Sequence, residues 1–360
     1  MRYVLLAVAV ALGALVSWLA LTPVPFQPVA WAPGPNPGKE GPFAANAALS
    51  AARAIPLGAP DARGPEDVAL GPDGLLYTGL ADGRIVRLPP AGGPLETLAN
   101  TGGRPLGLEF DATGTLVIAD AEKGLLALAP DGALRVLTDS VNGERMKFVD
   151  DLAIAADGTV WFSDASMRYG VADSIYDFFE GRATGRLIAW NPATGETKVH
   201  LDGLGFANGV ALGPDEAYVL VNETMRYRIT RYWLKGPKAG TAEPFIENLP
   251  GFPDNLTYDG RGTFWVAMFM PRNPLLDGLA PYPALRGMAY TLISTIAGPG
   301  GAVEPHGWVI GLDTEGRVVA NLQSSDGTVA ATTSVNRAGD ALYVGSLEGE
   351  AIRTLPVPAR

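Results

Sequence analysis

Four oxygen-bearing side chains stand at the same place in a repeated sequence pattern. They are Glu66, Asp150, Asn208 and Asp254. Each opens a short apolar run, and the residue eight positions later is glycine in three copies and glutamate in the fourth. Carboxylate and amide oxygens without histidine or cysteine favour a hard cation, and a wide ring of side chains suits calcium better than the strict octahedron of magnesium. The pattern therefore predicts a calcium site with these four residues as ligands.

The elements that must position these residues follow from the same pattern, which occurs six times as an apolar strand, a turn and a second apolar strand. The residues that open the copies are Glu66, Leu106, Asp150, Asn208, Asp254 and Ala331. Hairpins that recur at intervals of about 40 to 80 residues are typical of propeller blades, whose innermost strands line a central tunnel. Equivalent positions then form a ring around the tunnel. We predict an all-β fold, a six-bladed β-propeller over residues 51–360.

More oxygen ligands accompany the predicted ring, because Asp67, Asp151 and Asn255 directly follow three of its members. Carboxylates crowded into a tunnel of low dielectric repel one another unless a cation neutralises them. A bound ion can take part in catalysis or can simply hold the blades together, and position in the ring does not distinguish these two roles. The sequence is therefore compatible with a catalytic ion and with a purely structural one.

Composition excludes several classes of function. The 360 residues carry a net charge of −11, which argues against a nucleic-acid surface. The absence of cysteine rules out a disulfide partner and thiolate chemistry. Only His200 and His306 could assist a serine nucleophile, and the sequence contains no Gly-x-Ser-x-Gly motif.

The N-terminus contains an apolar run over residues 3–21, long enough to cross a bilayer as a helix. A cleaved signal peptide is the alternative, since residues 30–32 have the small-x-small form of a cleavage site. Residues 1–22 are therefore expected to be an anchor or signal, and the proline-rich residues 23–50 a tether. With Arg2 as its flanking charge, an uncleaved anchor would place the propeller on the non-cytoplasmic side, periplasmic or extracellular.

Two long insertions interrupt the repeats, over residues 166–184 and 269–301. They are expected to be surface loops or, alternatively, a substrate lid or a second membrane contact. Two Asn-x-Thr sequons, at Asn222 and Asn255, fall on predicted strands near the ring. We interpret these sequons as accidental rather than glycosylated.

The chain resembles the strictosidine synthase-like branch of the calcium propellers and, more distantly, the paraoxonases and the SMP-30/gluconolactonase group. The likeness rests on GPED at 64–67, FVDDL at 148–152, FANGV at 206–210, PGFPDN at 250–255 and LYVGS at 342–346. This resemblance implies a six-bladed propeller, calcium at the four ring residues and hydrolysis of lactones or aryl esters. It also implies that Asp254 is the base or nucleophile. Asp120, Asp164 and Glu223 end second strands at the face of the ring, and this position makes them other candidate proton acceptors near the ion. The alternative for those three is the capping of strand ends.

The chain departs from the pattern of the families that it resembles at three places. Asp150 stands where the family usually has asparagine, an extra charge that should tighten cation binding. Residues 329–335 offer no carboxylate in place of the last-blade glutamate of strictosidine synthase, so its amine–aldehyde condensation is not expected. Asp120 occupies the strand end that corresponds to a histidine of paraoxonase. A non-catalytic calcium-stabilised binding or scaffold propeller is the second hypothesis beside the lactone or aryl-ester hydrolase.

Overall fold

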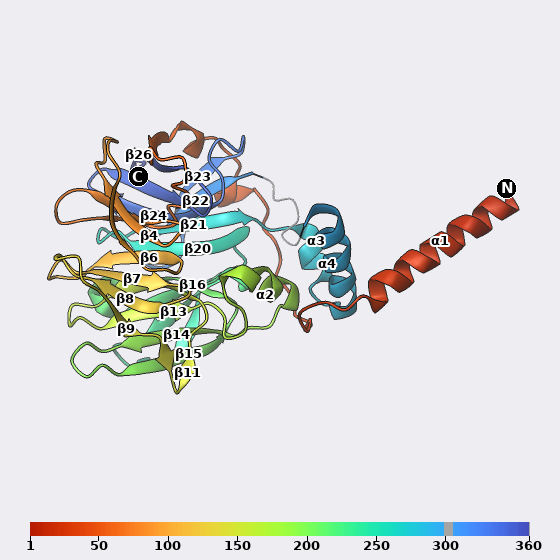
Figure 1. Ribbon diagram of the computed structural model, residues 1–360, viewed down its shortest axis with the longest axis horizontal. Coiled ribbons are helices and arrows are strands. Elements are labelled where there is room, and N and C mark those ends of the chain that lie inside the picture. Colours follow the sequence, from red (N-terminus) through yellow and green to blue (C-terminus); the bar gives the residue numbers. More distant parts are fainter. Residues whose placement is uncertain (299–304, 360) are drawn as a thin grey trace. The chain divides into compact units, whose positions relative to one another are not determined.

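A computed structural model describes residues 1–298 and 305–359. The chain divides into two compact units, a helical unit of residues 1–33, 172–182 and 273–303, and a propeller unit of residues 34–171, 183–272 and 304–360. Figure 1 shows the strands of the propeller and the four helices of the other unit. Residues 299–301, which end the second predicted insertion, lie outside the described residues.

Six antiparallel four-stranded sheets form the blades of the propeller unit (Figure 1). Blade one consists of β2 (Val68–Leu70), β3 (Leu76–Gly79), β4 (Arg84–Leu88) and β5 (Glu96–Asn100). Blade two consists of β6 (Pro105–Phe110), β7 (Leu116–Asp120), β8 (Gly124–Leu128) and β9 (Leu134–Thr138). Blade three consists of β12 (Val149–Ile154), β13 (Val160–Asp164), β14 (Gly185–Trp190) and β15 (Thr197–Leu204).

The remaining blades follow the same plan. Blade four consists of β16 (Ala207–Leu212), β17 (Tyr218–Glu223), β18 (Arg228–Trp233) and β19 (Ala242–Ile246). Blade five consists of β20 (Gly251–Tyr258), β21 (Phe264–Pro271), β22 (Gly307–Leu312) and β23 (Val318–Ser324). Blade six consists of β24 (Thr332–Ala338), β25 (Ala341–Ser346), β26 (Ala351–Pro356) and β1 (Arg53–Pro56), and a small hairpin joins β10 (Ser140–Val141) to β11 (Glu144–Arg145). The predicted all-β, six-bladed fold is confirmed.

The core of the propeller lies between neighbouring blades. Strands such as β7, β13 and β22 are buried along their whole length, because a blade is covered on both faces. Between blades five and six, for example, Trp265 and Val309 pack with Val335 and Leu342. This burial on both faces explains why the second and third strands of the blades are almost continuously apolar in the sequence.

Blade six is closed by the N-terminal strand of the propeller. β1 pairs antiparallel with β26, with Arg53 opposite Thr354 and Pro56 opposite Ala351. The segment that precedes β1 also contacts the propeller. The Arg272 guanidinium stacks 4.1 Å from the ring of Tyr227 and donates hydrogen bonds to the carbonyls of residues 34 and 35. Residues 34–52, most of them in the proline-rich segment, thus lie against the propeller.

The helical unit contains α1 (Arg2–Leu21), α2 (Ser174–Glu180), α3 (Pro274–Leu279) and α4 (Pro283–Ala297). Proline occupies the first positions of α3 and α4, where its missing N–H costs nothing, and Asn273 caps α3 by accepting from the backbone of Leu275. Both predicted insertions contribute helices to this unit. The helix expected over residues 3–21 is present, is long and apolar enough to cross a membrane, and has no buried residue.

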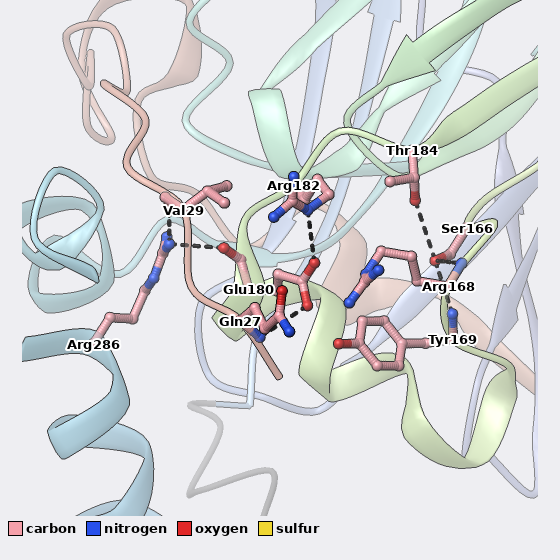
Figure 2. A network of polar contacts seen from close by, with 9 residues as sticks. All are labelled: Gln27, Val29, Ser166, Arg168, Tyr169, Glu180, Arg182, Thr184 and Arg286. Carbon is pink, nitrogen blue, oxygen red and sulfur yellow. Dashed lines mark hydrogen bonds and ion pairs between the residues drawn. The ribbon is translucent and has the colours of Figure 1, made fainter. Parts of the chain in front are cut away.

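Aromatic packing joins the segments of the helical unit. The ring of Phe26 lies 4.9 Å from Tyr290 and 6.0 Å from both Tyr176 and Phe179. The carboxylate of the fully buried Glu180 accepts from the backbone of Gln27 and from Arg182, as Figure 2 shows. The N-terminal segment, α2 and α4 therefore share one core.

Candidate metal centre at the propeller hub

β-Bulges create the ring at the hub. Five of the six innermost strands lose their regular pairing over two residues, and each interruption falls at the ring position. The unpaired pairs are residues 106–107, 150–151, 208–209, 254–255 and 333–334. A bulge frees two residues from the ladder and re-aims their side chains, which is why bulges often border functional sites. In blade one, β2 begins only after Glu66 and Asp67.

This register corrects the sixth member of the ring. We expected Ala331, because Gly339 follows it at the repeat spacing, but the pairing places Thr333 at the equivalent position. The physical reason is the shorter hairpin of blade six, in which Ala338 pairs with Ala341, whereas Ile154 pairs with Val160 in blade three. The Thr333 hydroxyl donates to the backbone carbonyl of Glu66 at 2.6 Å, so blade six supplies a hydroxyl to the hub but no carboxylate.

The four predicted ligands all lie buried in the propeller unit. Glu66, Asp150, Asn208 and Asp254 are each no more than 8% exposed. Burial, together with the charges of Asp254 and Asp150, raises the pKa of Glu66 well above its ordinary value. Burial also raises the pKa of Asp150 well above normal and that of Asp254 to about 7, although a hydrogen bond from Asn208 opposes the second shift. These carboxylates share an environment in which their negative charges are costly.

Several buried oxygens at the hub lack a hydrogen-bond donor, namely Oδ2 of Asp150, Oδ1 of Asn208 and Oδ1 of Asn255. Buried polar atoms are normally satisfied, so oxygens of this kind are suited to a cation. Among the described residues, no three His, Asp or Glu side chains converge as a ready-made metal cluster. The hub therefore fits a hard cation by the chemistry and burial of its oxygens, and an ion there would also draw on amide oxygens.

Arg104 is a hub residue that the sequence analysis missed. Its guanidinium is buried and donates to the carbonyls of Gly64 at 3.1 Å and Leu347 at 3.4 Å. Its positive charge opposes the upward pKa shifts of Glu66 and Asp150. The sequence did contain an indication of this role in the GRPLG motif at residues 103–107. Arg104 directly precedes an apolar innermost strand, where a charged side chain would not contribute to the apolar core.

The three other predicted acids act as clasps between the first two strands of their blades. One carboxylate oxygen of Asp120, Asp164 and Glu223 accepts from the backbone N–H of Arg104, Phe148 and Gly205, respectively. Asp164 also accepts from Arg186, and Glu223 from Arg228 and Thr230. All three acids are fully buried. Their contacts favour the capping interpretation, although Oδ2 of Asp120 has no hydrogen-bond partner.

A second feature of the hub is a cavity of about 560 Å³ lined by Asp67, Asp151 and Glu109. Asp67 accepts from the backbone of Leu108 at 3.0 Å, and Asp151 from that of Val210 at 2.8 Å. The two neighbours of the predicted ligands thus tie inner strands together. Both sequon asparagines, at positions 222 and 255, are also buried, so a folded propeller presents neither to a glycosyltransferase.

Comparison with known proteins identifies the family. Residues 150–237 match the strictosidine synthase family, and residues 41–88 match the strictosidine synthase-like N-terminal family. The strictosidine synthase-like 6 protein of Arabidopsis thaliana is 37% identical over 79% of this chain and 76% of its own length. The chain belongs to the strictosidine synthase-like family. The human adipocyte plasma membrane-associated protein is also 37% identical to it, over 82% of this chain and 76% of its own length.

Solved structures of other propellers have a fold similar to that of this strictosidine synthase-like chain. A gluconolactonase from Xanthomonas campestris is similar with a TM-score of 0.62 and 19% identity, over 94% of this chain and 99% of that one. A calcium-binding regucalcin from Agrobacterium tumefaciens is similar with a TM-score of 0.58 and 17% identity, over 85% and 93% of the two chains. At these identities the likeness concerns the fold.

Proposed function

We propose that the protein is a calcium-dependent hydrolase of lactones or aryl esters, with its active site at the propeller hub. The observation that carries this proposal is the set of buried oxygens without donors, on Asp150, Asn208 and Asn255, beside carboxylates whose pKa values are raised. The similar folds of a gluconolactonase and of a calcium-binding regucalcin support it as well.

Glu66, Asp150, Asn208 and Asp254 would hold the ion. A calcium ion bound there would polarise a substrate carbonyl and stabilise the oxyanion. Asp254 would take the proton from the attacking water, since its carboxylate is buried at the hub beside the other predicted ligands. Asn208 orients Asp254 by a side-chain hydrogen bond, and the amide of Asn255 does the same for Glu66.

A non-catalytic scaffold propeller is the second candidate, and the clasps favour it. Both carboxylate oxygens of Asp164 and of Glu223 already accept hydrogen bonds, so these two acids have little capacity to move protons. Under this alternative an ion at the hub would only join the blades. The condensation of strictosidine synthase remains disfavoured, because blade six supplies Thr333 and no carboxylate.

Measurements of calcium binding and of hydrolysis on the same samples distinguish the hydrolase from the scaffold. Calcium binding to the full chain in detergent is measured by calorimetry, and hydrolysis of aryl acetates and δ-lactones is measured with and without chelator. Asp254→Asn should lower kcat by about 10² or more while the fold is retained, and exposed Asp202→Asn is the matched control. Calcium binding without hydrolysis would favour the scaffold, and turnover that persists in Asp254→Asn would exclude Asp254 as the base.

We also propose that α1 anchors the protein in a membrane with the propeller on the non-cytoplasmic side. The length and apolar composition of α1 support an anchor, as does the name of the human relative. Arg2, the only charged residue at the N-terminal end of α1, supports the orientation. Protease should digest the propeller when added to right-side-out vesicles and should leave it intact in inside-out vesicles, which tests the orientation independently of the activity.

A further inference from the structure

Helix α4 buries polar side chains and exposes apolar ones, which is the reverse of a helix on the surface of a soluble protein. Its charged residue, Arg286, and the hydroxyl residue Thr291 are buried, while the hydroxyls of the half-buried Ser294 and the exposed Thr295 donate to the carbonyl of Thr291. In contrast, Leu285, Leu292 and Ile296 are 46%, 40% and 76% exposed. A helix packed on a protein in water normally turns its apolar stripe inward and its polar face outward. The exposed face of α4 therefore has the character expected beside lipid.

The exposed side chains form one stripe. The exposed Leu285, Leu292 and Ile296 and the half-buried Met288 lie three or four residues apart, which is the spacing of one helical face. Leu275 of α3 and Tyr282, between the two helices, are more than half exposed and add to the apolar surface. In residues 273–298 the sequence has only two charged side chains, at positions 277 and 286.

Arg286 fixes this orientation. Its guanidinium donates hydrogen bonds to the backbone carbonyls of Val29 and of Glu180, as seen in Figure 2. A rotation of α4 that buried the leucines would expose these carbonyls and break charge-assisted hydrogen bonds. The outward apolar stripe is thus built in by specific polar contacts and is not a consequence of poor packing.

The stripe is also continuous with the candidate membrane span. The C-terminal end of α1 and the first turns of α4 line one shallow cavity, formed by Leu19, Ala20, Pro283 and Met288 among others. A helix that leaves the membrane at Leu21 therefore delivers the start of α4 to the bilayer surface. Because both helices belong to one compact unit, their apolar surfaces face a common environment.

We propose that the surface formed by α3 and α4 is a second membrane contact, lying in the interface of the bilayer that α1 crosses. The occupant is the lipid bilayer itself, bound through apolar burial. Since the stripe carries no cationic residue, its insertion needs no anionic lipid and is insensitive to salt. This inference rests on the proposed anchor, and the test below keeps the two apart.

The test exploits the absence of cysteine, because one introduced cysteine is a unique labelling site. The full chain is reconstituted into phosphatidylcholine vesicles with an environment-sensitive fluorophore at Leu292→Cys or Ile296→Cys. Lipids that carry a nitroxide at a shallow or a deep acyl position are then added. Leu12→Cys in α1 reports the anchor, and Val136→Cys, which is 58% exposed on β9, is the matched apolar control on the propeller.

We expect the labels on α4 to be quenched most by the shallow nitroxide and Leu12→Cys most by the deep one. Val136→Cys should stay unquenched, and neither added salt nor anionic lipid should change the result at α4. Unquenched α4 labels in a chain whose α1 label is quenched would overturn the inference and leave the anchor standing. Quenching at α4 without quenching at α1 would support the contact and reject the anchor. A blue shift at α4 without lipid quenching would mean that protein covers the stripe, which also overturns it.

Discussion

The side-chain amide of Asn255 donates to both carboxylate oxygens of Glu66, at 3.1 and 3.2 Å, although 189 positions separate the two residues. This contact connects blade five to blade one across the hub, past blade six. It uses the nitrogen of Asn255 and leaves its oxygen without a donor. One asparagine thus holds a predicted ligand while offering an oxygen of its own.

Replacing this amide by a carboxylate should make the hub depend on calcium. Asn255→Asp places a second negative charge against Glu66, whose charged form is already disfavoured, and removes hydrogen bonds to a charged group worth about 1.5–3 kcal/mol. In chelator, we expect the free energy of unfolding of Asn255→Asp to be lower than that of the unchanged chain by about that amount. Added calcium should make this difference between the two proteins smaller. Asn191→Asp is the control, since exposed Asn191 uses only its oxygen as a turn acceptor. If Asn255→Asp lowers the free energy of unfolding by the same amount with and without calcium, the result would contradict an ion at the hub.

The clasp in blade three can be separated from a catalytic role. Asp164→Asn leaves the buried Arg186 without its partner, a change that typically costs about 3–5 kcal/mol. Urea unfolding should show this loss, and hydrolysis per folded molecule should be unchanged. The control is Asp313→Asn, which breaks a pair with the 73% exposed Arg317 and should cost less than about 1 kcal/mol. Normal stability with lost turnover would instead identify Asp164 as a proton acceptor.

Close approach of inner strands requires glycine at position 209. A Cβ added there would lie 2.4 Å from the backbone nitrogen of Leu256 and 2.6 Å from the carbonyl oxygen of Asp254, and neither backbone atom can move aside cheaply. Gly209→Ala should therefore lower the free energy of unfolding by about 1–3 kcal/mol and weaken calcium binding. Gly278→Ala, which meets nothing within 4 Å, should be nearly neutral. Equal denaturation midpoints for the two variants would show that the strands can separate at the hub.

The cavity of the hub predicts a pH dependence of stability. Burial raises the pKa of Glu109 to about 8, with a smaller opposing effect from the backbone of Ile154. Between about pH 4.5 and pH 8 the folded state then keeps a proton that the unfolded state has lost, so stability falls as pH rises. Glu109→Gln should reduce this slope in urea unfolding with chelator present, whereas exposed Glu122→Gln should not. An unchanged slope in Glu109→Gln would place the titration elsewhere.

The sequence predicted the parts of the fold that keep a fixed spacing. Glu66, Asp150 and Asp254 could be aligned because the first hairpins of blades one, two, three and five share one length. The hairpin of blade four is one residue longer, and Asn208 still occupies the equivalent bulge position at the hub. The sixth hairpin is shorter, and the expected position moved from Ala331 to Thr333 for that reason alone. The six blades were predictable from the same repetition.

Features that depend on pairing between distant segments were not predictable. β1 has four residues, one of them proline, and carries no strong strand pattern; only its partner β26, about 300 positions later, makes it a strand. The hydrogen-bond partners of Arg104 and Glu223 depend on which backbone groups the turns bring close, which a linear pattern does not encode, although capping of a strand end was one of the roles expected for Glu223. A second membrane contact was one of the alternatives for residues 269–301, but the sequence could not show which face of α4 is exposed, because its apolar periodicity is the same whichever side is buried.

The pairing of β1 with β26 has a consequence for biosynthesis. β1 is among the first propeller residues to leave the ribosome, and its partner at residues 351–356 is among the last. Until that partner emerges, blade six lacks its third strand, β26, and the outermost strand β1 has no strand to pair with. The ring therefore closes only after residues 351–356 have emerged, and a nascent chain arrested before residue 351 should bind chaperones that recognise open strand edges.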